Sequence, residues 1–189
     1  MRILAYCVMP NHWHLLLWPR EDGDLSRFVQ KITARHTQRW HLRHGTTGRG
    51  HLYQGRFKSF AVEDDRHLLT LCRYIEANPL RAGLVARAEH WPWSSLNFRP
   101  ECSALEASGN RGIGAAHLAL TPLPVALPDS WVSFVNEVPG IAETAAVRSC
   151  ASTGTPYGDK SWVSIAAGRL NVRMERRRPG PAPGASKRP

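Results

Sequence analysis

The feature that most restricts the fold of this chain is a pair of apolar stretches near its beginning. Residues 3–9 read Ile-Leu-Ala-Tyr-Cys-Val-Met, and residues 12–18 read His-Trp-His-Leu-Leu-Leu-Trp. Between them lie Pro10 and Asn11, which favour a turn. Two apolar runs of strand length, separated by a tight turn, pair as antiparallel strands. We therefore predict a β-hairpin here.

Two histidines, His12 and His14, flank Trp13 in the second of these predicted strands. Side chains alternate across a strand, so both imidazoles lie on one face and Trp13 lies on the other. Two neutral imidazoles on one face can chelate a divalent metal ion. A half-exposed strand that simply carries two histidines has the same pattern, and the pattern alone favours that plainer interpretation.

A helix with one apolar face is predicted to begin at Asp64 or Asp65, either of which can cap it. It should run to about Asn78, because Pro79 stops it. Projected at the helical repeat, four apolar residues fall on one face, which we expect to pack on the core. These residues are Leu68, Leu71, Cys72 and Ile75.

A second stripe of this helix lies about 120° away from the apolar face. It holds His67, Thr70, Tyr74 and Asn78. Tyr74 is therefore not placed as a core aromatic residue. Asn78 lies one turn further on, where its amide oxygen could be a third metal ligand. A partly buried tyrosine and an asparagine that ends a helix before proline fit this spacing equally well.

Another helix, predicted over residues 24–43 with Asp24 as its N-cap, is basic along one side. Every fourth residue is Lys or Arg: Arg27, Lys31, Arg35, Arg39 and Arg43. Like charges at this spacing repel by a few tenths of a kcal/mol per pair, roughly. Asp24 is the only acid in the stretch, so a polyanion lying against the helix would stabilise it. A solvated basic face is the alternative.

The overall charge favours the same kind of partner. The chain has 25 Lys and Arg against 15 Asp and Glu, a formal charge of +10. Such an excess favours nucleic acid or a membrane surface. A third strand is predicted over residues 56–62, and its Arg56 and Lys58 extend the positive surface. Aromatic rings nearby could stack on bases: Tyr53, Phe57 and Phe60.

The character of the chain changes after residue 98. Residues 99–128 are rich in Ala, Gly and Pro, which predicts a linker. Residues 129–172 predict a small helical extension, with helices near 129–148 and 159–170. Residues 173–189 are basic and rich in proline, so we expect a disordered tail.

Other sequence features exclude several classes of protein. The four cysteines are scattered and include no C-x-x-C pair, which argues against a zinc ribbon or a disulfide framework. The longest apolar run is too short to span a bilayer. We therefore expect a cytoplasmic protein with no membrane association.

Four segments, in this order along the chain, resemble the REP-associated tyrosine transposases. This family is an IS200-like, single-tyrosine branch of the HUH transposases. The segments are Ala-Tyr-Cys-Val-Met-Pro-Asn-His-Trp-His-Leu-Leu-Leu (5–17), Gly-His-Leu-Tyr-Gln-Gly-Arg-Phe-Lys-Ser (50–59), Arg-Tyr-Ile-Glu-Ala-Asn-Pro-Leu-Arg-Ala-Gly-Leu-Val (73–85) and Trp-Pro-Trp-Ser-Ser (91–95). The close resemblance covers about residues 1–98.

The resemblance implies an α+β fold: a ferredoxin-like HUH domain over residues 1–98, with a central antiparallel sheet flanked by helices. It implies that His12 and His14 bind Mg²⁺ or Mn²⁺, with Asn78 as the third ligand. It implies that Tyr74 is the nucleophile, which cuts and rejoins single-stranded or hairpin DNA through a 5′-phosphotyrosine. Relatives carry a further strand and helix before the matching segment, so we expect a truncated copy or a misassigned start.

Charge placement, rather than the resemblance, assigns the contacts with the DNA backbone. The expected contact residues are Arg27, Lys31, Arg35, Arg39, Arg56 and Lys58. We expect a protein associated with the nucleoid, acting as a monomer or homodimer. The alternative to an enzyme is a non-catalytic remnant that still binds hairpin or single-stranded DNA.

Overall fold

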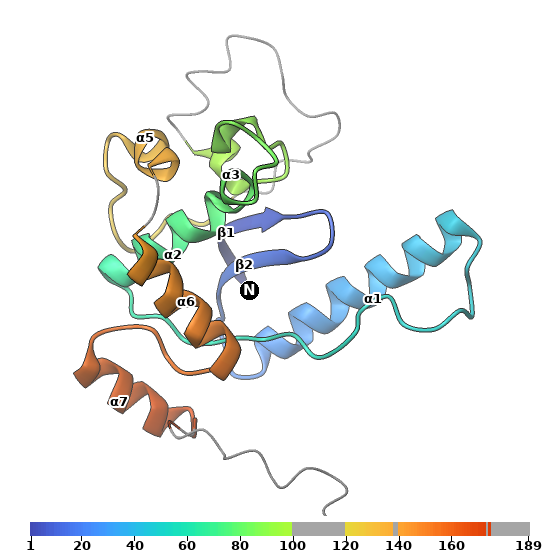
Figure 1. Ribbon diagram of the computed structural model, residues 1–189. Coiled ribbons are helices and arrows are strands. Elements are labelled where there is room, and N and C mark those ends of the chain that lie inside the picture. Colours follow the sequence, from blue (N-terminus) through green and yellow to red (C-terminus); the bar gives the residue numbers. More distant parts are fainter. Residues whose placement is uncertain (100–119, 138–139, 173, 175–189) are drawn as a thin grey trace, which may run out of the picture.

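The computed structural model describes residues 1–99, 120–137, 140–172 and 174 (Figure 1). The α+β class predicted from the sequence is confirmed. In chain order the elements are β1 (Arg2–Val8), β2 (Trp13–Trp18), α1 (Asp24–His44), α2 (Arg66–Glu76), α3 (Asn78–Arg81), the 3-10 turns η1 (Ala88–His90) and η2 (Ser95–Phe98), α5 (Trp131–Asn136), α6 (Ile141–Thr153) and α7 (Lys160–Arg169).

The predicted hairpin is confirmed. Strands β1 and β2 pair antiparallel, and the register places Cys7 opposite His14. The backbone N–H of Met9 donates to the carbonyl of His12 (2.8 Å), which closes the turn that Pro10 and Asn11 begin. His12 thus lies at the turn and His14 near the start of β2, on neighbouring positions of one face.

The segment 91–95 covers the other edge of β1. The N–H of Val8 donates to the carbonyl of Trp93 (3.0 Å), and Cys7 and Ser94 form an isolated antiparallel bridge. Unpaired strand edges expose backbone donors and acceptors. The Trp-Pro-Trp-Ser-Ser motif therefore supplies hydrogen-bond partners to backbone groups at this edge of the hairpin.

Helix α2 packs across the hairpin with the face that its apolar spacing predicts (Figure 1). Leu68 and Ile75 are each 3% exposed and Cys72 is fully buried. The predicted core side is therefore confirmed. Helices α5 and α6 contribute to the same core through four buried residues: Trp131, Val132, Val135 and Val147.

The strand predicted over residues 56–62 is wrong. Within the described part of the chain, its only β-pairing is a single parallel bridge between Val62 and Tyr157. Residues 91–95 take one edge of β1, and among the described residues no backbone hydrogen bond joins residues 56–62 to β2. The segment is instead largely exposed and leads from α1 back to α2.

The helix ends partly follow the predicted caps. Asp65 is the N-cap of α2, and its side chain accepts the N–H of His67 (2.7 Å). Asp24 is not the N-cap of α1, because Gly23 takes that position with a left-handed φ of 75°. The Asp24 carboxylate instead accepts the backbone N–H groups of the preceding turn, from Arg20 (3.0 Å) and Glu21 (3.2 Å).

Pro79 does not end the helical path. Helix α2 stops at Glu76, and α3 begins two residues later with Pro79 in its first turn. Proline is tolerated in a first turn because its missing N–H has no helical partner there. The helix predicted near residues 129–148 is also divided, into α5 and α6.

The linker expected over residues 99–128 lies mostly outside the described residues, as does the tail expected over 173–189. Among the helices that are described, none is long and apolar enough to cross a membrane.

Candidate functional site

The structure brings the two histidines and the tyrosine of the predicted site together. The ring centroids of His12 and His14 are 4.9 Å apart, and those of His14 and Tyr74 are 6.0 Å apart, both edge to face. His12 is exposed, whereas His14 and Tyr74 are half-buried. The hairpin turn, β2 and α2 thus supply one cluster of a phenol beside two imidazoles.

The electrostatics of His14 favour a neutral ring. Burial, then the nearby charges of His12 and Arg81, lower the pKa of His14 from 6.5 to about 4. A neutral imidazole keeps a lone pair, which a metal ligand needs. The Nδ1 atom of His12 lies 2.7 Å from the Asn11 Oδ1 atom. Such a second hydrogen bond orients ligating histidines, so this donor set fits a divalent cation.

The side chain of Asn78 is held by the backbone of α2. Its Nδ2 atom donates to the carbonyl of Tyr74 (3.0 Å), and its side chain is buried. This bond fixes the amide plane. The Oδ1 atom makes no hydrogen bond to any described residue, so the oxygen remains for another partner.

Arg81 is a further residue of the cluster, and the sequence analysis missed it. Its Cζ atom lies over the Tyr74 ring, 4.2 Å from the centroid. Its Nη1 atom is buried with no hydrogen-bond partner. The stripe of Tyr74 and Asn78 continues to position 81 with helical spacing, but a helix predicted to stop at Pro79 does not include this position.

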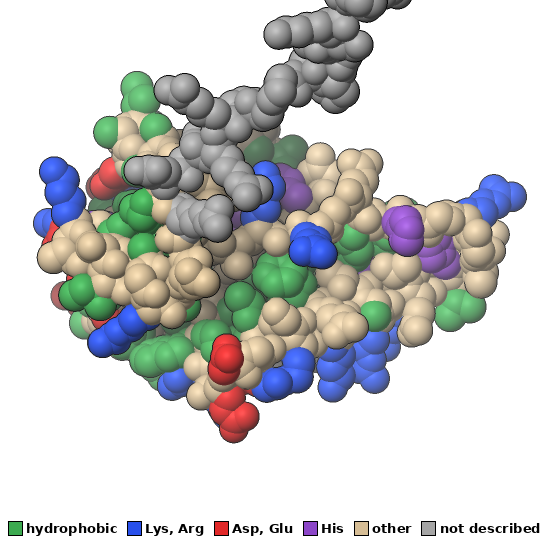
Figure 2. Space-filling model, turned by 90° about the horizontal axis from the view of Figure 1, so that it is seen from below, with side chains coloured by type: hydrophobic (Ala, Val, Ile, Leu, Met, Phe, Trp, Pro, Cys, Tyr) green, Lys and Arg blue, Asp and Glu red, His purple; other side chains and the backbone are tan. Residues whose placement is uncertain are grey.

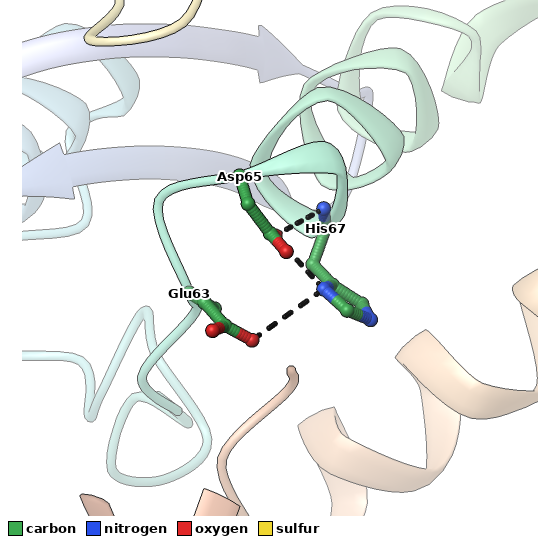
Figure 3. A group of neighbouring side chains, drawn as sticks. All are labelled: Glu63, Asp65 and His67. Atoms are coloured by element: carbon green, nitrogen blue, oxygen red, sulfur yellow. Dashed lines mark hydrogen bonds and ion pairs between the residues drawn. The ribbon is translucent and has the colours of Figure 1, made fainter. Parts of the chain in front are cut away.

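A second group of possible metal ligands lies at the start of α2 (Figure 3). The Nδ1 atom of His67 is 2.8 Å from Asp65 Oδ1 and 3.7 Å from Glu63 Oε2. Both carboxylates also hold backbone: Asp65 caps α2, and Glu63 accepts the N–H of Asp159 (2.7 Å). Both carboxylates thus have a structural role. Asp65 caps the helix, and Glu63 holds the segment before α7.

This second group is separate from the tyrosine cluster. His67 precedes Tyr74 by seven residues of one helix, a rise of roughly 10 Å. His67 instead contacts Tyr157, with ring centroids 5.0 Å apart, edge to face. The two clusters therefore cannot share one ion.

The basic residues predicted to bind DNA lie on α1 and on the segment after it. Helix α1 projects from the hairpin as an arm, and of its residues only Val29 is buried. Figure 2 shows Lys and Arg side chains gathered along one edge of this arm. Arg27 pairs with Asp24 (2.8 Å). The other basic residues here are exposed and form no ion pair with any described residue: Lys31, Arg35, Arg39, Arg43, Arg56 and Lys58.

Aromatic rings occupy another side of the α1 arm, which the sequence analysis did not detect. Trp40 and His44 are stacked, with centroids 4.0 Å apart and planes 22° apart. His36 Nδ1 lies 2.7 Å from the hydroxyl of Tyr53, which fastens the returning segment beside the helix. Trp40 is 42% exposed. The arm thus offers both positive charge and exposed ring faces.

Known proteins resemble the first part of this chain. Residues 1–78 match the family model of the IS200-like transposases. The chain is 27% identical over 105 residues to a REP-associated tyrosine transposase of Haemophilus influenzae, covering 50% of this chain and 58% of the relative. It is 28% identical over 97 residues to a REP-associated tyrosine transposase of Escherichia coli, covering 50% and 54%. The resemblance stated above is confirmed.

The extent of these matches is limited. The chain spans little more than half the length of the two curated relatives. No solved structure matches it significantly. The family match covers the hairpin, α1 and all of α2, and it ends at Asn78. It therefore includes the histidine pair and Tyr74, while Arg81 lies just beyond it.

Proposed function

We propose that this chain is a metal-dependent tyrosine transposase that cuts and rejoins single-stranded or hairpin DNA. The observation that carries the proposal is the cluster itself: the Tyr74 ring lies edge to face against His14, which contacts His12. A phenol beside a pair of imidazoles combines a nucleophile with ligands for a cation. The match of residues 1–78 to a transposase family supports the same function.

The residues of the cluster would divide the work as follows. His12, His14 and Asn78 would hold Mg²⁺ or Mn²⁺, which when bound polarises the scissile phosphate and neutralises charge on its oxygens. Asn78 also fixes its own side chain to the backbone of Tyr74. Ligands held in this way would help to bring the scissile phosphate into line with the phenol oxygen.

In the proposed cleavage the phenol oxygen of Tyr74 bonds to phosphorus, and the bond from phosphorus to O3′ breaks. The phenol proton passes to water, and the departing O3′ takes a proton from water. A 5′-phosphotyrosine and a free 3′-hydroxyl result. Because the covalent link keeps the phosphodiester energy, a later 3′-hydroxyl can attack it and rejoin strands without ATP.

We infer that the DNA backbone lies along the α1 arm. Exposed, unpaired basic side chains such as Lys31 and Arg35 would neutralise phosphates. Exposed rings such as that of Trp40 would stack on unpaired bases, a contact available only in single strands and loops. We further propose that the hairpin and α2 are part of a ferredoxin-like HUH fold.

The test is covalent trapping. The full chain is incubated with a labelled hairpin oligonucleotide and Mn²⁺, and a denaturing gel detects the protein–DNA adduct. We expect an adduct with the wild type and none with Tyr74→Phe or with EDTA. Tyr157→Phe is the matched control, because Tyr157 is also half-buried and edge to face with a histidine. It should give as much adduct as the wild type.

Binding is measured in parallel by gel shift, so that the alternative function is tested too. A wild type that binds the hairpin but forms no adduct would be a DNA-binding remnant of a transposase. An equal adduct from Tyr74→Phe would show that another group is the nucleophile. Either result overturns the proposal.

A further inference from the structure

We propose that Arg81 is a catalytic residue of this site, whose guanidinium binds a non-bridging oxygen of the scissile phosphate. The proposal rests on the proposed function of Tyr74 as the nucleophile. It assigns a phosphate ligand from the chain itself, on α3 (Asn78–Arg81), next to the residues that would hold the cation.

The first support is a buried hydrogen-bond donor of Arg81 that has no acceptor. The Nη1 atom of Arg81 is buried and has no acceptor. Arg81 also forms no ion pair with any described residue. A buried donor without a partner is costly, so such groups call for an explanation, and a ligand is one. An anionic oxygen is the strongest acceptor for a guanidinium.

Arg2 Nε and Arg73 Nε are also buried without an acceptor, so the unpaired nitrogen alone does not single out Arg81. Among the described residues, however, the two most deeply buried arginines, Arg73 and Arg99, lie against carboxylates. Arg99 donates from both Nε and Nη2 to Glu76. Arg73 lies within 4.0 Å of the Glu137 and Glu143 carboxylates, at 3.8 and 3.9 Å. Each of these positive charges is compensated within the protein. Arg81 lacks such compensation and is thus available for an external anion.

The second support is where the guanidinium lies. Its Cζ atom is 4.2 Å from the centroid of the Tyr74 ring, a stacking distance for a cation on an aromatic face. The ring of the proposed nucleophile therefore holds the guanidinium. The same ring also contacts His14, with ring centroids 6.0 Å apart. A phosphate attacked by Tyr74 would meet Arg81 and the histidine pair together.

The third support is chemical. Attack on a phosphodiester adds negative charge to the non-bridging oxygens, and a fixed donor aimed at that charge stabilises the transition state more than the ground state. Arg81 needs no proton transfer for this task, because a guanidinium stays protonated. Removing one such donor typically lowers the rate by a factor of about 100 to 1,000.

The experiment begins by mapping the cleaved linkage with the wild-type adduct, which establishes the proposed function first. If the wild type forms no adduct, the proposed function has failed, and with it the premise for Arg81. With an adduct in hand, single-turnover adduct rates are measured at saturating DNA for Arg81→Gln and Arg81→Lys. Arg148→Gln, which removes an exposed helical arginine, is the matched control.

We expect Arg81→Gln to lower the adduct rate by a factor of about 100, with DNA affinity changed by less than about threefold. Arg81→Lys should recover part of the rate, because it keeps the charge but not the planar fork. Arg148→Gln should match the wild type. An adduct rate for Arg81→Gln within about threefold of the wild type would overturn the proposal.

A second substrate separates direct phosphate contact from a structural effect. An oligonucleotide with a neutral methylphosphonate at the mapped linkage lacks the charge that Arg81 would neutralise. On it, the gap between the wild type and Arg81→Gln should shrink to within about tenfold. An unchanged gap on both substrates would show that Arg81 only supports the fold. The same comparison with Arg81→Lys applies if the Gln variant does not fold.

Discussion

Substitution of the buried residue Glu76 should strongly lower the stability of the fold. Glu76 is fully buried. Its Oε1 atom accepts from the Ser95 hydroxyl (2.6 Å) and from two nitrogens of Arg99 (2.8 and 3.0 Å). Its Oε2 atom accepts from the Trp131 indole (2.7 Å). The Glu76 side chain thus connects α2 both to the segment that holds Ser95 and Arg99 and to helix α5.

The expected cost of breaking this network follows from the partner that remains. Glu76→Gln removes the charge opposite Arg99, which is only 5% exposed. Among the described residues, Arg99 is then left with neutral partners: the carbonyl of Leu4 (2.9 Å), the sulfur of Cys72 (3.1 Å) and the amide oxygen of the new glutamine. A buried charge that loses its counter-charge typically costs about 3–5 kcal/mol. Against a typical total stability of about 5–15 kcal/mol, this loss is large.

Removing both charges should cost less than removing one. In Glu76→Gln/Arg99→Met no uncompensated charge is left in the core, and such replacements of a whole buried pair are often close to neutral. We therefore expect the double variant to be more stable than either single variant. The coupling energy between the two positions should reach about 2–3 kcal/mol.

Urea unfolding followed by circular dichroism gives these free energies, provided that the slopes with denaturant agree among the variants. The surface pair of Arg66 and Asp159, whose side chains are 74% and 54% exposed, supplies the control. Arg66→Gln should lose less than about 1 kcal/mol. A loss below about 1 kcal/mol for Glu76→Gln, or a double variant less stable than both singles, would refute the reasoning.

Two further predictions concern pH and salt. The pKa of His14 is about 4 in the folded chain against 6.5 for an unperturbed histidine, so the unfolded chain takes up a proton first as pH falls. The contribution of His14 to stability should thus be constant above about pH 6.5 and fall toward pH 4, by at most about 3 kcal/mol. His14→Asn should reduce the slope of stability with pH between these values in urea titrations; an equal slope in the variant would contradict it. For DNA binding, Lys31→Gln/Arg35→Gln should reduce the log–log salt slope by about two. Arg148→Gln/Arg169→Gln, which change exposed arginines of α6 and α7, should leave it unchanged, and an equal change in both pairs would contradict specific contacts with the arm.

Local patterns were sufficient for the parts of the fold that local interactions build. The hairpin followed from two apolar runs around Pro10 and Asn11, and its register then placed the two histidines on one face. Helix α2 followed from a 3.6-residue period and from Asp65, whose cap bond spans two residues. In both cases the signal and the partner lie within one turn or one hairpin.

The errors arise where the partner is distant or where a local rule has an exception. Residues 56–62 have strand composition, but a strand also needs a partner, and among the described residues only Val62 has one, in a single bridge with Tyr157. No local pattern reports whether a distant partner is present. Arg81 was missed for the opposite reason. Proline usually ends a helix, but at Pro79 a new helix begins, and the stripe of Tyr74 continues.

Contacts between α2 and residues distant in sequence also position the candidate site. The rotation of α2 about its axis decides whether Tyr74 faces His14 or solvent. Apolar packing of residues such as Leu68 and Ile75 turns one face of the helix to the core, but hydrophobic contact is not directional. Hydrogen bonds are directional, so the contacts of Glu76 with Arg99 and Trp131 restrict the rotation further. These partners lie 23 and 55 residues away in sequence. The position of the phenol beside the histidine pair is therefore set largely by charged and polar groups on the opposite side of the helix, which take no part in the chemistry.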